Sequence, residues 1–229
     1  MIGLILETST ERSMLAAFND AACLFREDLP YGIQNSHLLL PELQNKLQEH
    51  VLKAKNLEFI AVGVGPGSYT GIRVGATIGK TLAFTLEIPL IGICTLETFV
   101  PENDGAFAAV IDAKIGGVYL LTGFKKGEVI EMTKTPRAYS LEEAANILEE
   151  IPTIVTPNAE KIRPKLEALK PGNNWDWQNL YPNAGRMLSL AQRKMNEGNL
   201  IHDQSLELMY MRKTQAEIEK ERKDELRNL

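Results

Sequence analysis

Ala61-Val-Gly-Val-Gly-Pro-Gly-Ser-Tyr-Thr-Gly-Ile-Arg-Val-Gly-Ala76 joins a short apolar run to a glycine-rich turn and then to a helical pattern with regularly spaced glycines. The run from Phe59 to Val64 is rich in β-forming residues and has the length of a buried strand. Proline has no amide hydrogen for a sheet, so the strand ends at Gly65-Pro66-Gly67. This stretch predicts a strand, a tight turn and a helix in succession.

The turn has features of an anion-binding loop. Ser68 and Thr70 can each cap the following helix, and the free amides at a helix start attract phosphate or carboxylate. An ordinary strand-to-helix connection has the same composition. Both interpretations stay open at this point.

Two better-known phosphate motifs are excluded. A Walker A loop before Gly79-Lys80-Thr81 needs glycine at the position that Val74 occupies. A dinucleotide fingerprint needs glycines in the spacing G-x-G-x-x-G, and Gly65, Gly67 and Gly71 miss that spacing by one residue.

Small residues recur at every fourth position of the predicted helix, namely Gly71, Gly75, Gly79 and Ala83. An interior glycine costs about 1 kcal/mol relative to alanine, so close packing must compensate. The groove that such residues form faces either a second chain or the protein's own sheet. Apolar side chains for packing on that sheet are supplied by Ile72, Val74, Ile78, Leu82 and Leu86.

Composition limits the class of protein. The chain has 229 residues, is 44% hydrophobic and carries a formal charge of −5, which fits one large or two small globular domains without the excess of basic residues typical of nucleic-acid binding. Residues 1–7 lack the basic region of a signal peptide, and no segment reaches membrane-spanning length. Cys23 and Cys94 show no metal or redox spacing. We expect a soluble cytoplasmic protein without a membrane partner.

The order of predicted elements indicates an α/β fold. Three β-prone runs, a long amphipathic helix, a strand, the glycine helix and another strand give the order βββαβαβ, which is that of a ribonuclease-H-like half. These elements span residues 1–8, 13–18, 22–27, 36–53, 59–64, 70–86 and 89–94, with Ser36 as a candidate cap of the long helix.

The second half repeats this order in a degenerate form. Its elements span residues 106–111, 118–124, 128–134, 140–149, 151–156, 159–169 and 184–197. Ser140 and Glu143 form a capping box for the first helix of this half. We expect tandem ribonuclease-H-like domains of the actin, Hsp70 and sugar-kinase (ASKHA) type, with mixed five-stranded sheets flanked by helices. The expected boundaries are 1–104, completed by about 206–213, then 105–205 and a charged tail at 214–229.

Five motifs occur in the order that resembles the bacterial TsaB (YeaZ) family, a glycoprotease-like (peptidase M22-like) branch of that superfamily. The resemblance is close as far as Tyr119 and looser up to residues 208–212. It rests on Glu7-Thr-Ser-Thr10, His37-Leu-Leu-Leu-Pro41, Gly65-Pro-Gly-Ser-Tyr-Thr-Gly-Ile-Arg73, Ile88-Pro-Leu-Ile-Gly92 with Thr95-Leu96, and Ile111-Asp-Ala-Lys-Ile-Gly-Gly-Val-Tyr119.

The resemblance implies a non-catalytic subunit of the machinery that adds threonylcarbamoyl to adenosine in tRNA. Its implied partners are the catalytic paralogue TsaD in a heterodimer and the ATPase TsaE, with a homodimer when TsaD is absent and tRNA contacted only indirectly. The implied partner interface comprises the helix after His37 and the glycine helix, with His37, Leu40, Leu43, Leu47, Gly71, Ile72, Gly75, Gly79 and Ala83. The charged tail from Lys213 is a further candidate for docking TsaE or TsaD.

The residues themselves support the absence of catalysis. Metal ligation in the paralogue resembles H-x-x-x-H on a helix, but Pro41 stands four residues after His37, and His50 and His202 show no ligand spacing. No serine has the sequence context of an activated nucleophile. We therefore expect no metal site, no required cofactor and no protease activity.

A small-molecule kinase or ATPase is the alternative. Kinases of this superfamily place metal and phosphate with an acid in the first hairpin, where Glu7 stands, and Asp112 holds the matching place in the second half. Turn capping by both acids is the competing interpretation, and Lys114 and Gly117 replace the Arg and Glu of the family pattern. Weak ATP or ADP binding, in the cleft or at the partner interface, stays open through Glu7, Thr8, Ser9, Gly65, Gly67, Ser68, Thr70 and Asp112.

Overall fold

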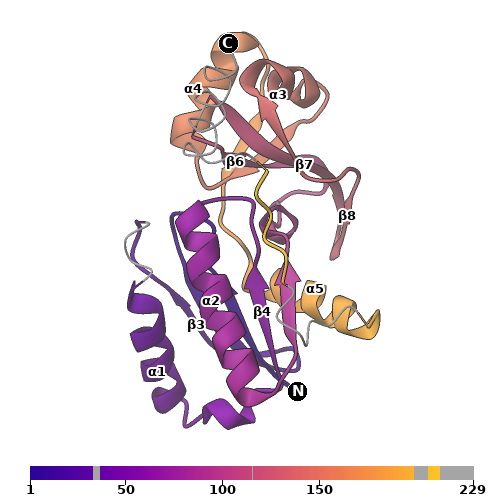
Figure 1. Cartoon of the computed structure of the whole chain (residues 1–229). Coiled ribbons are helices and arrows are strands. Elements are labelled where there is room, and N and C mark those ends of the chain that lie inside the picture. Colours follow the sequence, from indigo (N-terminus) through magenta and orange to yellow (C-terminus); the bar gives the residue numbers. More distant parts are fainter. Residues whose placement is uncertain (33–36, 115, 199–205, 212–229) are drawn as a thin grey trace, which may run out of the picture.

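Two mixed β-sheets, one in each half of the chain, organise the molecule into two lobes (Figure 1). The computed structural model describes residues 1–32, 37–114, 116–198 and 206–211. The predicted Ser36 cap, His202 and the charged tail at 214–229 lie outside these residues.

The first sheet has the predicted βββαβαβ topology. Its strand order is β3-β2-β1-β4-β5. The strand β2 pairs antiparallel with both β1 and β3, β4 pairs parallel with β1, and β5 pairs parallel with β4. The strands are β1 (Ile2–Glu7), β2 (Met14–Asn19), β3 (Ala22–Asp28), β4 (Phe59–Gly63) and β5 (Leu90–Ile93).

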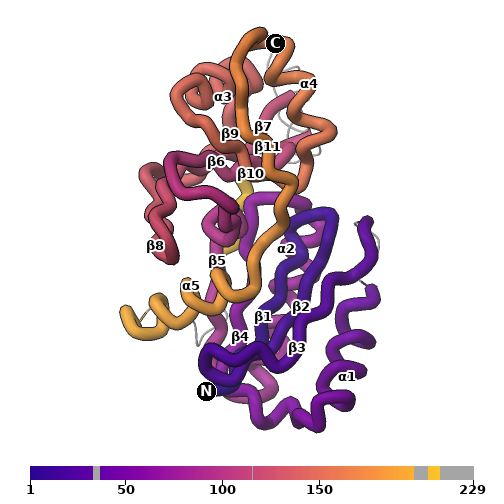
Figure 2. Tube along the Cα trace, turned by 180° about the vertical axis from the view of Figure 1, so that it is seen from behind, coloured from indigo at the N-terminus to yellow at the C-terminus, as the bar shows by residue number. Residues whose placement is uncertain are grey.

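Helices cover both faces of this sheet because side chains along a strand alternate between its faces. Leu4 and Leu6 of β1 pack in the core beneath α1 (Leu39–Glu49) and α2 (Tyr69–Leu86). Ile5 faces the other way and packs against α5 (Ala184–Asn196). Figures 1 and 2 show α5 on the opposite side of the sheet from α1.

The position of α5 corrects the expected domain boundary. We expected residues 105–205 to form the second domain, but the buried side chains of α5 pack on the first sheet. Met187 is fully buried and Leu190 is nearly so. The amphipathic sequence of α5 predicts the helix, but not which of the two sheets it covers.

The second sheet repeats the strand order of the first. Written in the same direction as the first sheet, the order is β8-β7-β6-β10-β11, so that β6 corresponds to β1 and β7 to β2. The strand β9 also pairs with β7. Because β9 pairs with Gly117–Leu120 and β8 with Gly123–Lys126, the two short strands share one position in the sheet. The strands are β6 (Gly105–Asp112), β7 (Gly117–Lys126), β8 (Val129–Met132), β9 (Arg137–Ser140), β10 (Thr153–Thr156) and β11 (Asp176–Asn179).

This sheet has six strands where we expected five. The unpredicted strands β9 and β11, with the sequences RAYS and DWQN, lack a clear apolar alternation. Their pairing with β7 and β10 therefore has no local signal. The remaining helices are α3 (Leu141–Leu148), which has the predicted capping box, and α4 (Ala159–Leu169), with single turns η2 (Ala54–Asn56) and η3 (Thr95–Thr98) elsewhere.

The segment at 206–211 returns to the first lobe. The amide of Met209 donates to the carbonyl of Val64 at 2.8 Å, and Leu206 is buried in the core of that lobe. The ring of Tyr210 lies 4.8 Å from that of Tyr69 at the start of α2. In Figure 1 this segment is the yellow strand-like trace between the lobes.

None of the helices in the described ranges is long and apolar enough to cross a membrane.

Candidate functional site

The glycine-rich turn packs directly against the loop that follows β1. The amide of Ser68 donates to the carbonyl of Ser9 at 2.7 Å, and the hydroxyl of Thr8 donates to the carbonyl of Gly71 at 2.7 Å. A Cβ atom added at Gly67 would lie 2.2 Å from the carbonyl oxygen of Ser9. The backbones of the two loops therefore touch, and no space is left between them. Here glycine permits a close approach of two backbones, which its missing Cβ explains.

The glycines of α2 face the protein's own sheet. A Cβ atom at Gly75 would lie 2.3 Å from Oγ1 of Thr8, and one at Gly79 would lie 2.4 Å from Cγ1 of Val62. The prediction that this face binds a second chain is wrong, and the alternative, packing on the sheet, is correct. Packing on the sheet buries five of the predicted interface residues, namely Gly71, Ile72, Gly75, Gly79 and Ala83.

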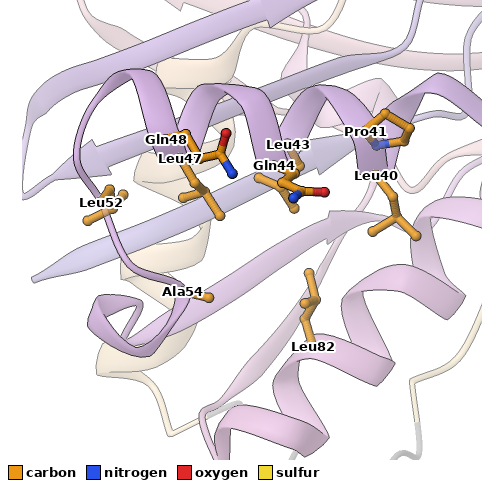
Figure 3. Close-up of a pocket in the computed structure, with 9 residues that line it drawn as sticks. All are labelled: Leu40, Pro41, Leu43, Gln44, Leu47, Gln48, Leu52, Ala54 and Leu82. Atoms are coloured by element: carbon orange, nitrogen blue, oxygen red, sulfur yellow. The ribbon is translucent and has the colours of Figure 1, made fainter.

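An apolar groove lies between α1 and α2. It has a volume of about 460 Å³, and Figure 3 shows Leu40 and Leu82 projecting into it from the two helices. Leu40 is 51% exposed. The groove is lined by Leu40, Pro41, Leu43, Gln44, Leu47, Gln48, Leu52, Ala54 and Leu82. Three predicted interface residues, Leu40, Leu43 and Leu47, are among them, and His37 lies exposed just before α1.

Glu7 is enclosed at the end of β1. Its carboxylate accepts hydrogen bonds from the amide of Ser9 at 2.5 Å and from the hydroxyl of Thr95 at 3.0 Å. Burial raises the pKa of Glu7, although these hydrogen bonds act in the opposite direction. Glu7 has no exposed surface, so it contacts no ligand in this arrangement.

The other predicted nucleotide contacts divide into buried and accessible groups. Thr8, Ser9 and Gly65 are buried, whereas Thr70 is exposed. Ser68 caps α2 by accepting from the amide of Gly71 at 3.2 Å, which confirms one of its two predicted roles. A phosphate between the glycine turn and the β1 loop would have to displace backbone.

Asp112 serves a turn at the end of β6. Its carboxylate accepts from the amide of Lys114 at 3.0 Å, and its own amide donates to the side-chain oxygen of Asn158 at 3.1 Å. This is the turn-capping role weighed against catalysis. No described residue hydrogen-bonds to both Glu7 and Asp112.

An ion pair joins the lobes beside these loops, and sequence reasoning missed it. Nζ of Lys161 on α4 lies 2.8 Å from Oε1 of Glu11, and the hydroxyl of Tyr31 donates to the same carboxylate. Burial would raise the pKa of Glu11, but the hydrogen bonds from Lys161 and Tyr31 lower it overall. The bond to Glu11 raises the pKa of Tyr31 to about 12. Residues 150 positions apart carry no local signal of such a contact.

Among the residues that the structure describes, no group of three His, Cys, Asp or Glu side chains is placed to hold a metal ion. His50 instead packs against the ring of Phe25, with the ring centroids 5.3 Å apart.

Comparison with known proteins identifies the family. Residues 33–166, more than half of the chain and including the glycine-rich stretch, match the family model described as "TsaD: tRNA N6-adenosine threonylcarbamoyltransferase". The Escherichia coli K12 protein "tRNA threonylcarbamoyladenosine biosynthesis protein TsaB" is 29% identical over 224 residues, which cover 93% of this chain and 95% of that protein. The chain belongs to this family, in its TsaB (YeaZ) branch.

Other TsaB relatives agree. The Bacillus subtilis protein of the same name is 38% identical over 92 residues, which cover 38% of this chain and 40% of that protein. The solved structure "YeaZ from Pseudomonas aeruginosa" shares the fold with a TM-score of 0.75 at 21% identity, over 91% of this chain and 99% of that one. The resemblance and the α/β fold class predicted from the sequence are thus confirmed.

Proposed function

We propose that this chain is a non-catalytic subunit in the biosynthesis of threonylcarbamoyladenosine in tRNA, and that it binds a TsaD-type paralogue through the groove between α1 and α2. The names of its TsaB relatives support the pathway. The exposed apolar groove is the observation that supports the mode of action. The proposal places the protein in the cytoplasm, with TsaE as a further partner and tRNA contacted only indirectly.

The chemistry of the groove fits a protein partner. Its lining is mainly leucine, and Phe84, also on α2, is 69% exposed. Covering apolar surface contributes about 25 cal/mol per Å², and contiguous exposed apolar patches mark interaction sites. A paralogue of the same fold would offer its own pair of helices, so that helix packs on helix. A second copy of this chain offers the same surface, which is why we infer a homodimer when the paralogue is absent.

The two candidate acids support a non-catalytic role. Glu7 is fully buried, and Asp112 holds a turn through its hydrogen bond with the amide of Lys114. The glycine turn and the β1 loop approach each other so closely that no room for a phosphate is left between them. These contacts favour the scaffold over a kinase or ATPase.

Leu40→Glu is expected to weaken binding of the cognate TsaD-type protein by at least about tenfold, because it places a charge in the apolar groove. Complex formation should be measured by calorimetry and by the mass of the complex in size-exclusion chromatography. Val129→Glu is the matched control, since Val129 is 57% exposed on β8 in the other lobe, and it should bind like the wild type.

The outcomes separate the alternatives. Equal binding by Leu40→Glu and wild type would contradict the proposed surface, and no binding by wild type would contradict the proposed partner. ATP turnover by the purified chain alone, abolished by Glu7→Gln, would favour the kinase or ATPase instead.

A further inference from the structure

A second cavity lies between the lobes, away from the groove of the proposed partner. It has a volume of about 450 Å³ and is enclosed by the first half of α5, the β7–β8 hairpin and the turn after β2. Both views show β8 beside α5 (Figures 1 and 2). Small-molecule sites commonly have volumes of about 300–1,000 Å³. The cavity is therefore large enough for a ligand of several heavy atoms.

The half-buried guanidinium of Arg186 lines this cavity. Its Nε donates to the carbonyl of Glu97 at 3.3 Å, and its Nη2 donates to the carbonyl of Ile130 at 3.1 Å. Both acceptors are neutral, and within the described ranges no carboxylate forms an ion pair with Arg186. Desolvation lowers the pKa of Arg186. A partly buried cation held only by carbonyls, with N–H groups to spare, is suited to an anionic partner.

The rest of the lining limits the charge of that partner. Lys125 also lines the cavity, but its ammonium donates to the carbonyl of Glu102 at 3.0 Å and lies 3.9 Å from the carboxylate of Asp104. Glu128 adds one negative charge to the lining. Because Asp104 already lies beside Lys125, Arg186 is the lining cation whose hydrogen-bond acceptors are both neutral carbonyls, and one carboxylate would match its single charge.

The cavity also has an apolar wall and neutral polar groups. Phe18, Val100 and Leu188 offer hydrocarbon surface, while Ser189 and Gln192 offer hydrogen-bonding groups. Such a mixture of apolar walls and a few polar groups is typical of sites for small organic molecules. An inorganic anion would leave the apolar wall unused.

We propose that this cavity binds a small organic monocarboxylate, whose carboxylate pairs with the guanidinium of Arg186 and whose apolar part lies against Phe18 and Leu188. A planar guanidinium can bind both oxygens of a carboxylate in parallel. Nothing in this site depends on the α1–α2 groove or on the proposed partner.

Benzoate is the probe, titrated into the full chain by calorimetry and by NMR of the arginine side-chain N–H groups. We expect saturable binding that shifts the Arg186 signal. Arg186→Lys should weaken binding at least tenfold, because the ammonium cannot reproduce the paired hydrogen bonds. Inorganic phosphate should bind at least tenfold more weakly than benzoate.

Gly185→Met tests the cavity without touching Arg186. Gly185 lines the cavity, and in the described part of the chain, apart from the backbone of its own helix, an added Cβ would meet Oδ1 of Asn183 at 3.4 Å and no other atom within 4 Å. The methionine side chain should therefore fill the space and abolish benzoate binding in a protein that folds normally. Leu40→Glu is the control and should bind benzoate like the wild type.

Three results would overturn the proposal. The first is the absence of saturable binding up to about 10 mM benzoate. The second is undiminished binding by folded Gly185→Met, and the third is phosphate binding as tight as that of benzoate.

Discussion

Gly71→Ala is expected to lower the free energy of unfolding by at least about 2 kcal/mol, although alanine favours a helix by about 1 kcal/mol. The new Cβ would lie 1.9 Å from the carbonyl oxygen of Thr8. Because that atom belongs to the backbone of the β1 loop, relief requires the loop and α2 to move apart. Urea denaturation of wild type and variant measures the difference.

Gly185→Ala is the matched control, since it also replaces a helical glycine. The nearest described atom to its Cβ, outside its own helix backbone, would be Oδ1 of Asn183 at 3.4 Å, so this variant should be as stable as the wild type or slightly more so. Equal stability of Gly71→Ala and Gly185→Ala would contradict the close approach of α2 to the β1 loop.

A double-mutant cycle locates the contact further along the same helix. The Cβ added by Gly75→Ala would lie 2.3 Å from Oγ1 of Thr8 and 3.5 Å from each of its Cβ and Cγ2 atoms. Thr8→Ala removes the nearer atom. Gly75→Ala should therefore cost less in the Thr8→Ala background than in the wild type.

Glu7→Gln is expected to become more stable relative to wild type as the pH rises above about 4.5, the ordinary value for a glutamate. Burial raises the pKa of Glu7 in the folded state. Between the two pKa values the unfolded chain has lost the proton and the folded chain retains it. The wild type therefore loses up to about 1.4 kcal/mol of stability per pH unit in that range.

Glu7→Gln can keep the local hydrogen bonds, so wild type and variant differ at this site mainly in the ability to lose a proton. A glutamine oxygen can accept from the amide of Ser9. Thr95 lies 3.0 Å from both the Glu7 carboxylate and Oγ of Ser9, so its hydroxyl can donate to Ser9 and accept from the new amide.

Unfolding free energies from urea titrations at pH 4.5 to 8 test this prediction. Glu131→Gln, an exposed change on β8, should follow the pH dependence of the wild type. Parallel curves for wild type and Glu7→Gln would show that the burial of Glu7 does not shift its pKa.

The strands and helices of the first lobe were predictable because each has a local signal. An apolar run that ends at Gly65-Pro66-Gly67 marks β4, and Ser68 caps α2 at its predicted position. In the second lobe, Ser140 caps α3 as predicted. The strands β9 and β11 were missed because their short, polar sequences become strands only through pairing with neighbours. The long helix was predicted over 36–53, whereas the structure has it at 39–49.

The candidate site was only partly predictable. The apolar periodicity of α1 indicates a face with Leu43 and Leu47, but which side chains remain exposed depends on the position of α2 across the groove. The ion pair of Glu11 with Lys161 and the cavity around Arg186 join segments far apart in the chain. No spacing within the sequence encodes such contacts.

The sequence by itself determined the family and the repeated α/β order, because local apolar patterns, turn residues and the motif from Gly65 to Arg73 are properties of short segments. It also required that the glycines of α2 pack closely against a neighbouring surface. Only the tertiary structure decided that this surface is the protein's own β1 loop and sheet, since a second chain would satisfy the same glycine spacing. Gly71, Gly75 and Gly79 are buried, whereas Leu40 and Leu82 line the groove between α1 and α2, which is the surface proposed to bind a partner.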